Sequence, residues 1–265
     1  MNIAVQTLAN GGLVAIPTET VYGLGAAINN EVAIAKIFVV KGRPQNHPLI
    51  VHLADIDQLH QVAHDIHPDA IKLAHACWPG PLTLLLHRNE NVSPSITGGR
   101  DTVAVRIPDN AFTRQLILDL GSPIAAPSAN RFGKVSPTTA QHVCDDLQND
   151  VDLIVDDGAS SIGVESTIID FSVSPPQLLR PGGIPIEDIE QILGYTIRDT
   201  DGISRASGML QNHYQPSCNV LLVFTDQEAQ QLKDTLVSQY ERVRILNRCD
   251  NLPLYATLLY SDLRQ

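Results

Sequence analysis

Short apolar runs of strand length recur through the first part of this chain, and proline, glycine or polar residues close each run. The runs are GGLVAIPTE, PLIVHL, PLTLLLHR, TVAVRIP, PIAAP, VDLIVDDG, STIIDFS and PQLLRPG. Such runs predict buried strands. Five other segments predict helices, namely NNEVAIAKIFVVKG, DIDQLHQVAHDI, PDAIKLAHACW, TTAQHVCDDLQ and PIEDIEQIL. Because strands outnumber helices up to about residue 180 and helices recur between them, we expect an α/β fold with a mixed sheet flanked by helices rather than a strict βαβ succession.

The first of these helices has marked ends. Asn29 or Asn30 can cap its N-terminus, and Gly42 can end it. Its apolar face is expected to consist of four residues, Val32, Ala35, Ile37 and Phe38.

The apolar periodicity stops near Asp199 and returns after Cys218. The stretch between them is rich in glycine, serine, asparagine and proline, which is typical of a linker. We therefore expect a main domain over 1–198, a linker over 199–217 and a small domain over 218–265. The last part predicts strand, helix, strand, helix (NVLLVF, TDQEAQQLKDTLVSQY, RVRILN and LPLYATLLYSDLRQ), a small Rossmann-like α/β unit. With so few strands, this unit is expected to pack on the main domain or on another chain.

The charge balance limits how the chain can use its positive residues. The formal net charge is −11, whereas binding a polynucleotide over a wide surface requires a basic face. Basic residues are therefore expected to act locally. The candidates are Lys41, Arg43, Arg100, Arg106, Arg131, Lys134 and Arg180, and several of them lie beside proline, glycine or serine at expected strand ends and turns. Their placement predicts one pocket for a small anionic ligand, although surface solubilisation explains each of them taken alone.

The cysteines and the N-terminus bear on the cellular compartment. Cys77, Cys144, Cys218 and Cys249 are scattered without a CxxC pair, which is typical of a reduced, cytosolic protein. The N-terminus lacks a basic region followed by a long apolar region, so no signal peptide is predicted. No apolar run approaches the length that spans a bilayer. We expect a cytoplasmic protein that does not associate with membranes.

Four segments at expected strand ends are rich in hydroxyl or cationic groups. They are PTETVYGLG, KGRPQNHPLIVH, APSANRFGKVSPT, and GVESTIID followed by RPGG. Hydroxyls, backbone amides near glycine, arginine and lysine are the groups that bind phosphate and carboxylate. Arg43 offers a planar fork for bidentate phosphate contact, Lys41 offers a point charge, and Pro44 stiffens their loop. A solvated helix C-terminus explains the same two charges equally well.

Several common site motifs do not fit. SANRFGKVS lacks the spacing of a Walker loop, YGLGAA lacks that of a dinucleotide fingerprint, and GVESTI lacks that of a serine hydrolase. His60 and His64 lie four apart on an expected helix, where the missing ligand context favours solvated side chains over a zinc site. His52 lies inside the apolar run LIVHL, where a core histidine and a pocket-lining histidine both fit.

Six segments together resemble the YrdC-type threonylcarbamoyl-adenylate synthase family. They are PTETVYGLGAA, KGRP with HPLIVHL, TVAVRIPDN, PIAAPSANRFGKVSPT, ESTIID and LLRPGG, and they cover roughly Asn10 to Gly183 in the family's order. SGMLQNHYQP resembles the linker of the longer, two-domain branch. The resemblance implies a YrdC/RibB-like fold, in which a twisted mixed sheet surrounds a large concave cleft, and it makes residues 1–198 the catalytic domain and 199–217 a lid.

The resemblance also implies an activity. Such enzymes are nucleotidyltransferases that combine L-threonine, bicarbonate and ATP into threonylcarbamoyl-AMP and release pyrophosphate, with Mg²⁺ accompanying ATP. The product then passes to a tRNA threonylcarbamoyl transferase, which uses it for the N6-threonylcarbamoyladenosine (t6A) modification at position 37 of tRNA. Binding of tRNA by this chain itself is expected to be weak or indirect.

Site residues follow from the same resemblance. The implied threonine contacts are Thr20, His52, Arg106, Ala126 and Ser166, with Arg106 holding the carboxylate. The implied ATP contacts are Arg43, His47, Thr102, Ser128, Ser136, Arg180 and Tyr214. His47 stands where the family usually has asparagine, and His213 competes with Tyr214 as the linker residue at the nucleotide. Lys41 and Arg43 are the implied catalytic residues, because their charges would offset the repulsion between a carbamate and ATP.

Two alternatives stay open. The same fold could serve as a nucleotide- or RNA-binding module without turnover, or as a carbamoyl-transfer relative with a different acceptor. In longer relatives further strands and helices follow the segment LYATLLYSDLRQ, so the C-terminal domain is expected to be abridged here.

Overall fold

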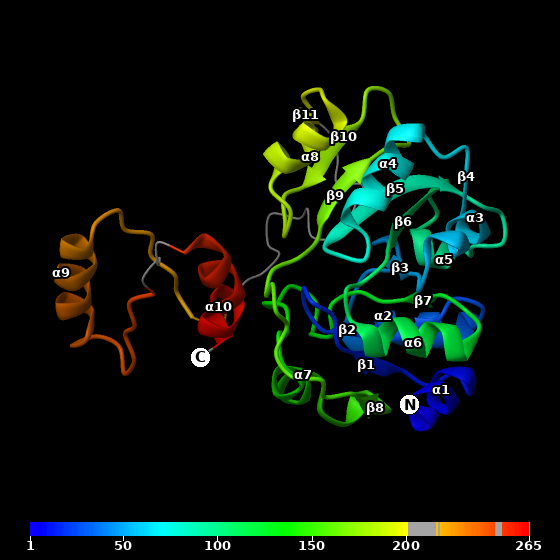
Figure 1. The fold of residues 1–265 in the computed structure, drawn as a ribbon. Helices are drawn as coiled ribbons and strands as arrows, with labels where there is room; N and C mark the ends of the chain where they lie inside the picture. Colours follow the sequence, from blue (N-terminus) through cyan, green and yellow to red (C-terminus); the bar gives the residue numbers. More distant parts are fainter. Residues whose placement is uncertain (201–215, 217, 247–250, 265) are drawn as a thin grey trace.

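A computed structural model shows a sheet-based main domain with a small helical unit beside it (Figure 1). The structure describes residues 1–200, 216, 218–246 and 251–264. The expected linker lies almost entirely outside these ranges, and so do His213 and Tyr214. None of the helices in the described ranges has the length and apolarity that a membrane crossing requires.

The strands of the described residues form one large mixed sheet. They are β1 (Val14–Ile16), β2 (Gly23–Ala27), β3 (Ile50–His52), β4 (Ala63–His64), β5 (Leu82–Arg88), β6 (Thr102–Arg106), β7 (Ile124–Ala125), β8 (Leu153–Ile154), β9 (Thr167–Asp170), β10 (Gln177–Arg180) and β11 (Arg198–Asp199). Their order is β11-β10-β9-β5-β6-β3-β7-β2-β1-β8, with β4 beside β5. Parallel pairs such as β3–β6 and β5–β9 occur with antiparallel pairs such as β5–β6. The predicted mixed sheet is confirmed.

Helices pack around this sheet. They are α1 (Asn2–Ala9), α2 (Glu31–Lys41), η1 (Ile56–Gln58), α3 (Leu59–Val62), α4 (Pro68–Cys77), α5 (Pro94–Thr97), α6 (Ala111–Leu120), α7 (Ala140–Leu147), η2 (Gln148–Asp150) and α8 (Ile186–Leu193). α4 lies beside α8, and α1 lies beside α6 (Figure 1). The main apolar core includes buried residues of α2, α4 and β5, and a second cluster joins α1 and α6 to β1.

The ends of α2 are encoded locally. The Asn30 side chain accepts a hydrogen bond from the backbone N–H of Ala33, and Gly42 ends the helix with φ 63°, a left-handed conformation that favours glycine. The predicted cap and end are confirmed. The predicted apolar face is right at Ile37 and Phe38 but wrong at Val32 and Ala35, which are both exposed. The buried residues follow the helical period as Ala33, Ile34, Ile37 and Phe38.

The elements of the main domain that lie outside the sequence prediction include α1, α5, α6, β2 and β11. β2 has the sequence GLGAA, and glycine and alanine are weak strand formers. The small residues of β2 allow the neighbouring strand β7 to pack closely against it. A Cβ on Gly25, for example, would lie 2.9 Å from Cγ2 of Ile124. The single helix expected over DIDQLHQVAHDI is also wrong, because the chain divides there into η1, α3 and β4.

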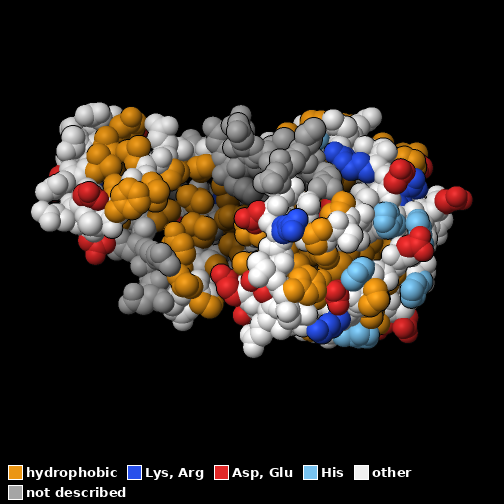
Figure 2. Space-filling model, turned by 90° about the horizontal axis from the view of Figure 1, so that it is seen from above, with side chains coloured by type: hydrophobic (Ala, Val, Ile, Leu, Met, Phe, Trp, Pro, Cys, Tyr) orange, Lys and Arg blue, Asp and Glu red, His pale blue; other side chains and the backbone are white. Residues whose placement is uncertain are grey.

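The described part of the C-terminal unit is helical. α9 (Asp226–Leu236) and α10 (Leu252–Arg264) are formed as predicted. The strands expected over NVLLVF and RVRILN are not formed among the described residues, because no strand of the described chain pairs with them. Their apolar side chains stay exposed, including Val220, Leu221, Leu222 and Phe224. Figure 2 shows apolar side chains gathered over this unit.

Candidate functional site

One pocket collects residues from segments that are far apart in the chain. Its lining consists of Thr18, Thr20, Val21, Gly23, Arg43, Ile50, His52, Arg106, Ala126, Pro127, Ser128, Glu165 and Arg180. Seven of them are residues that the family resemblance implies, namely Thr20, Arg43, His52, Arg106, Ala126, Ser128 and Arg180. The structure therefore brings distant cationic and hydroxyl groups together around one hollow, while the ligand that each contacts stays a prediction.

The central strands position two of these side chains. His52 and Arg106 are paired neighbours where the parallel strands β3 and β6 end. Because side chains alternate along a strand, Ile50 and Ala104 lie on the same face of the sheet, within a small buried apolar cluster. Thr102 also belongs to this face, but it lies four residues earlier on β6, about 13 Å away, and does not line the pocket.

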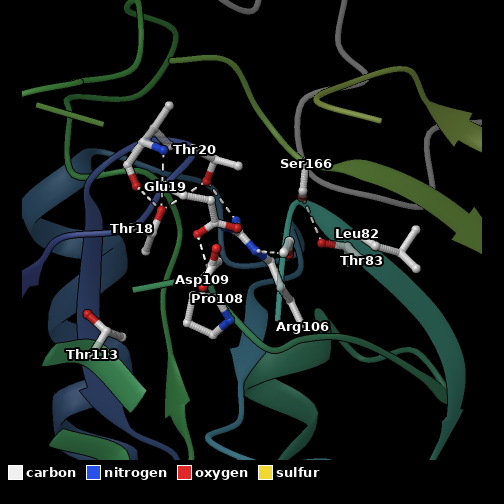
Figure 3. Close-up of polar contacts among 12 residues, drawn as sticks. Thr18, Glu19, Thr20, Leu82, Thr83, Arg106, Pro108, Asp109, Thr113 and Ser166 are labelled. Atoms are coloured by element: carbon white, nitrogen blue, oxygen red, sulfur yellow. Dashed lines mark hydrogen bonds and ion pairs between the residues drawn. The ribbon is translucent and has the colours of Figure 1, made fainter. Parts of the chain in front are cut away.

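The Arg106 guanidinium is held on three sides (Figure 3). Nε donates to the carbonyl oxygen of Gly80 (3.3 Å), and Nη1 donates to Thr20 Oγ1 (2.7 Å). Nη2 lies 2.6 Å from Glu19 Oε1 in an ion pair whose side chains are each 4% exposed. Glu19 Oε2 accepts a hydrogen bond from the backbone N–H of Asp109. A guanidinium has five N–H donors, so these contacts leave two for a ligand, which suits a carboxylate bound by both.

A second cation of the pocket, Arg180, is fixed by Ser166. Nε and Nη2 of Arg180 donate to the carbonyl oxygen of Ser166, and Nη2 also lies 3.0 Å from its hydroxyl. Glu165 Oε2 lies 3.7 Å from Arg180 Nη2, and Glu165 Oε1 accepts a hydrogen bond from the Ser136 hydroxyl (2.6 Å). Ser136 and Ser166 are both buried and do not line the pocket themselves. Their contacts position residues that do.

Lys41 and Arg43 have different surroundings although only Gly42 separates them. Lys41 is buried, and its Nζ donates to the carbonyl oxygens of Ser128 and Asn130 and to the Asn130 side chain. These contacts use all three donors of an ammonium group, and burial, followed by the nearby Arg43 charge, lowers the pKa of Lys41 well below its usual value. Lys41 thus holds the backbone of the loop that contains Ser128 and Asn130. Its contact with phosphate stays a prediction.

Arg43 does line the pocket. Its Nη2 donates to the carbonyl oxygen of Pro48 (2.9 Å), and its guanidinium lies 5.7 Å from the ring centre of Phe132. His47 packs edge-on against the same ring and does not line the pocket. Burial, together with the charges of Arg43 and Arg100, lowers the pKa of His47. His47 is therefore neutral at pH 7, so it would contact a nucleotide by a hydrogen bond rather than by charge.

His52 lines the pocket as a neutral imidazole. Burial, followed by the Arg106 charge, lowers its pKa from 6.5 to about 3. Its Nδ1 lies 3.2 Å from the carbonyl oxygen of Ile50. Both interpretations of this histidine therefore hold together: it is buried in the core and it faces the pocket.

The buried His52 gives a testable pH dependence. Its pKa in the unfolded chain is near 6.5, above the folded value, so the unfolded state binds more protons between these two pH values. The free energy of unfolding should therefore fall as pH falls below about 6.5, by up to about 1.4 kcal/mol per unit from this group. Urea unfolding of the wild type and His52→Asn between about pH 7.5 and 5 measures the difference in slope. Equal slopes would contradict a buried, neutral His52.

Two acids of the site were not singled out from the sequence, Glu19 and Glu165. Both stand inside segments that were, PTET and GVEST, next to threonine or serine. An acid within such a buried, hydroxyl-rich run needs a cation partner, and that is the signal that could have identified them. Their partners, Arg106 and Arg180, come from other strands.

Fold and pocket together define an α/β protein whose mixed sheet carries a cation-lined pocket for anionic ligands. Residues 6–182 match the Sua5/YciO/YrdC family model, whose description is Telomere recombination, and residues 184–265 match Threonylcarbamoyl-AMP synthase, C-terminal domain. The chain belongs to the Sua5/YciO/YrdC family, in the branch that carries this C-terminal domain. The resemblance seen in the sequence is confirmed.

The chain is also similar to individual proteins of this family. The chain is 48% identical over 230 residues to the threonylcarbamoyl-AMP synthase of Pyrococcus abyssi, covering 84% of this chain and 67% of that protein. It is 46% identical over 221 residues to that of Bacillus subtilis, covering 81% of this chain and 64% of that protein. The structure of P. abyssi Sua5 complexed with L-threonine superposes with a TM-score of 0.90 at 41% identity, covering 98% of this chain and 83% of that chain. The chain thus spans about two thirds of the length of these curated relatives.

Proposed function

We propose that this chain is a threonylcarbamoyl-AMP synthase, which forms threonylcarbamoyl-AMP and pyrophosphate from L-threonine, bicarbonate and ATP. The observation that carries the proposal is the single pocket in which Arg43, Arg106 and Arg180 converge. The names of the relatives and the threonine bound to one of them support the choice of substrate.

Threonine binds at the Arg106 corner of the pocket in this proposal. The two remaining donors of Arg106 take its carboxylate, and the hydroxyl of Thr20 lies beside them. His52 contributes a neutral polar wall, since its pKa is about 3. Ala126 leaves room because its side chain is a single methyl group. The amine of threonine then stays available for reaction.

The reaction brings two anions together. The threonine amine attacks the carbon of CO₂ or bicarbonate and becomes a carbamate, releasing a proton if it attacks CO₂ and water if it attacks bicarbonate. A carbamate oxygen then attacks the α-phosphorus of ATP, and pyrophosphate leaves with the electrons of the broken P–O bond. Arg43 and Arg180 offset the repulsion between carbamate and phosphates. Holding the reactants in line supplies on the order of 7–11 kcal/mol at best, and no covalent bond to the protein is required.

Mg²⁺ enters together with ATP in this scheme. Among the described residues that line the pocket, Glu165 is the one carboxylate, and no group of three or more metal-binding side chains occurs in the described ranges. Such a lining suits Mg²⁺ held mainly by phosphate oxygens and water, with Glu165 as its protein-side oxygen donor, because Mg²⁺ in nucleotide sites needs only one or two carboxylates. When bound, the ion neutralises phosphate charge.

The product would pass to a tRNA threonylcarbamoyl transferase for t6A formation. The net charge of −11 supports weak or indirect contact of this chain with tRNA, because tight binding requires many cationic contacts to phosphates. The chemistry needs only small molecules in the pocket, which supports an aqueous compartment such as the cytoplasm.

Pyrophosphate release tests the proposed function. The full chain, incubated with ATP, Mg²⁺, bicarbonate and L-threonine, is expected to release pyrophosphate, and omitting threonine should reduce the rate to background. Carbamoyl phosphate and other amino acids serve as comparison substrates. Folded protein that binds ATP and shows no threonine-dependent release would indicate a binding module. Release with another acceptor alone would indicate a different carbamoyl-transfer enzyme.

A further inference from the structure

α10 of the C-terminal unit is anchored in the main domain by Arg264. Its Nη2 lies 2.8 Å from Asp146 Oδ2, and the two side chains are 11% and 9% exposed. Nη1 donates to the carbonyl oxygen of Val135, and Nη2 donates to that of His142 (2.9 Å). A buried arginine with one carboxylate and two carbonyl acceptors makes a directed attachment, because breaking such a pair would leave a charge uncompensated.

A second contact of α10 reaches the pocket wall through apolar side chains. Tyr260 is buried and packs with Val21 and Val135. Val21 itself lines the pocket. In Figure 1, α10 lies between α9 and the main domain. The helix therefore presses on the pocket wall and on the loop before Ser136 at the same time.

A third contact reaches the segment that leads to Glu165. Thr257 Oγ1 donates to the carbonyl oxygen of Ser161 (2.9 Å). The backbones approach so closely here that a Cβ on Gly163 would lie 2.4 Å from the carbonyl oxygen of Thr257. Gly163 also has φ +74°, a conformation that favours glycine. α10 thus packs against the chain two residues before Glu165.

These contacts converge on one interaction inside the site. Val135 precedes Ser136, and Ser136 donates to Glu165, which faces Arg180. The two segments that α10 holds, 132–136 and 161–165, are those that bring Ser136 and Glu165 together. At the threonine corner, the carbonyl oxygen of Glu19 accepts a hydrogen bond from the backbone N–H of Ile162 in the second segment (2.7 Å). The side chains of Arg106 and Glu19 are instead held by residues of other segments, namely Gly80, Thr20 and Asp109.

We propose that Arg264 is a positioning residue for the nucleotide part of the pocket, through which α10 sets the placement of Ser136 and Glu165 beside Arg180. The inference rests on the proposed function, because that function places Arg180 beside the phosphates of ATP. The C-terminal unit then acts on ATP binding rather than on threonine binding. Loosening α10 should weaken the affinity for nucleotide selectively.

The test compares Arg264→Met with the wild-type full chain. We expect the Kd for α,β-methylene-ATP, measured by calorimetry, to rise about tenfold, and the KM for ATP to rise similarly. The KM for threonine should change less than about twofold. Arg242→Met is the matched control, since Arg242 is an exposed arginine of the same unit, and it should leave all three values unchanged.

Asp146→Asn provides a second variant if Arg264→Met folds poorly. It removes the same ion pair from the main-domain side and should raise the Kd in the same direction, and the double variant should be no weaker than Arg264→Met alone. Unchanged nucleotide affinity in these variants, or equal rises in both KM values, would overturn the inference. If the proposed function itself is wrong, the wild-type chain would bind the nucleotide but would show no threonine-dependent release of pyrophosphate. This result is distinct from any effect of the Arg264 variant.

Discussion

Replacing Arg106 by methionine is expected to abolish threonine-dependent turnover and to lower the free energy of unfolding. The variant loses both donors that face the threonine carboxylate, and removing one partner of a buried charge pair costs about 2–5 kcal/mol of binding. We therefore expect kcat/KM for threonine to fall about thirtyfold or more. The variant also leaves the Glu19 carboxylate buried without its cation, which should destabilise the fold by about 3–5 kcal/mol. Steady-state kinetics and urea unfolding measure the two effects.

The double variant Glu19→Gln/Arg106→Met separates the two effects. Removing the unpaired carboxylate should recover part of the lost free energy of unfolding, because an amide costs less to bury than a charge. Activity should not recover with it, since the carboxylate donors are still missing. A single Arg106→Met variant that keeps kcat/KM for threonine within about tenfold of the wild type would contradict the assigned role.

Replacing Arg43 by alanine is expected to lower kcat by about 10²–10³, the usual effect of removing one preorganised group that stabilises developing charge. The KM for threonine should change little, because Arg43 belongs to the phosphate side of the pocket in our proposal. Some loss of melting temperature should accompany it, since Arg43 is buried and donates to Pro48. Saturation kinetics in both substrates, with thermal unfolding, give these values.

Two further variants sharpen the Arg43 prediction. Arg43→Lys keeps the charge but not the planar fork, so it should recover only part of kcat. Arg198→Ala removes an exposed arginine that does not line the pocket and should leave kcat unchanged. If Arg43→Ala retained wild-type kcat while its melting temperature fell, Arg43 would be structural only.

The elements that the sequence predicts well are those whose first and last residues have a recognisable capping role. α2 begins at an asparagine that caps it and ends at a glycine with positive φ, and both signals lie within the segment itself. β2 carries no such signal, because its glycines and alanines form a strand only where neighbouring strands approach closely. The run NVLLVF shows the opposite failure. Its composition favours a strand, but a strand needs a hydrogen-bonding neighbour, and the described residues provide none.

For the site, too, some features could be predicted from the sequence and others depend on residues that only the fold brings together. Residue types predict a pocket for anions, and the family resemblance implies most of its lining. Whether a cation lines the pocket depends on local geometry that the residue types do not give. Lys41 is the last residue of α2, and its side chain donates to the backbone of the Ser128 loop. Arg43 follows Gly42, which has a left-handed conformation, and it lines the pocket. The pairing of Glu19 with Arg106 joins residues far apart in the chain, so only the folded sheet reveals it.

A crystal structure with L-threonine and α,β-methylene-ATP tests the central claim most directly. The account predicts both ligands in one pocket, with the threonine carboxylate within hydrogen-bond distance of Arg106 and the α-phosphate beside Arg43 and Arg180. Ligands bound on separate surfaces, or a threonine carboxylate that does not contact Arg106, would contradict it.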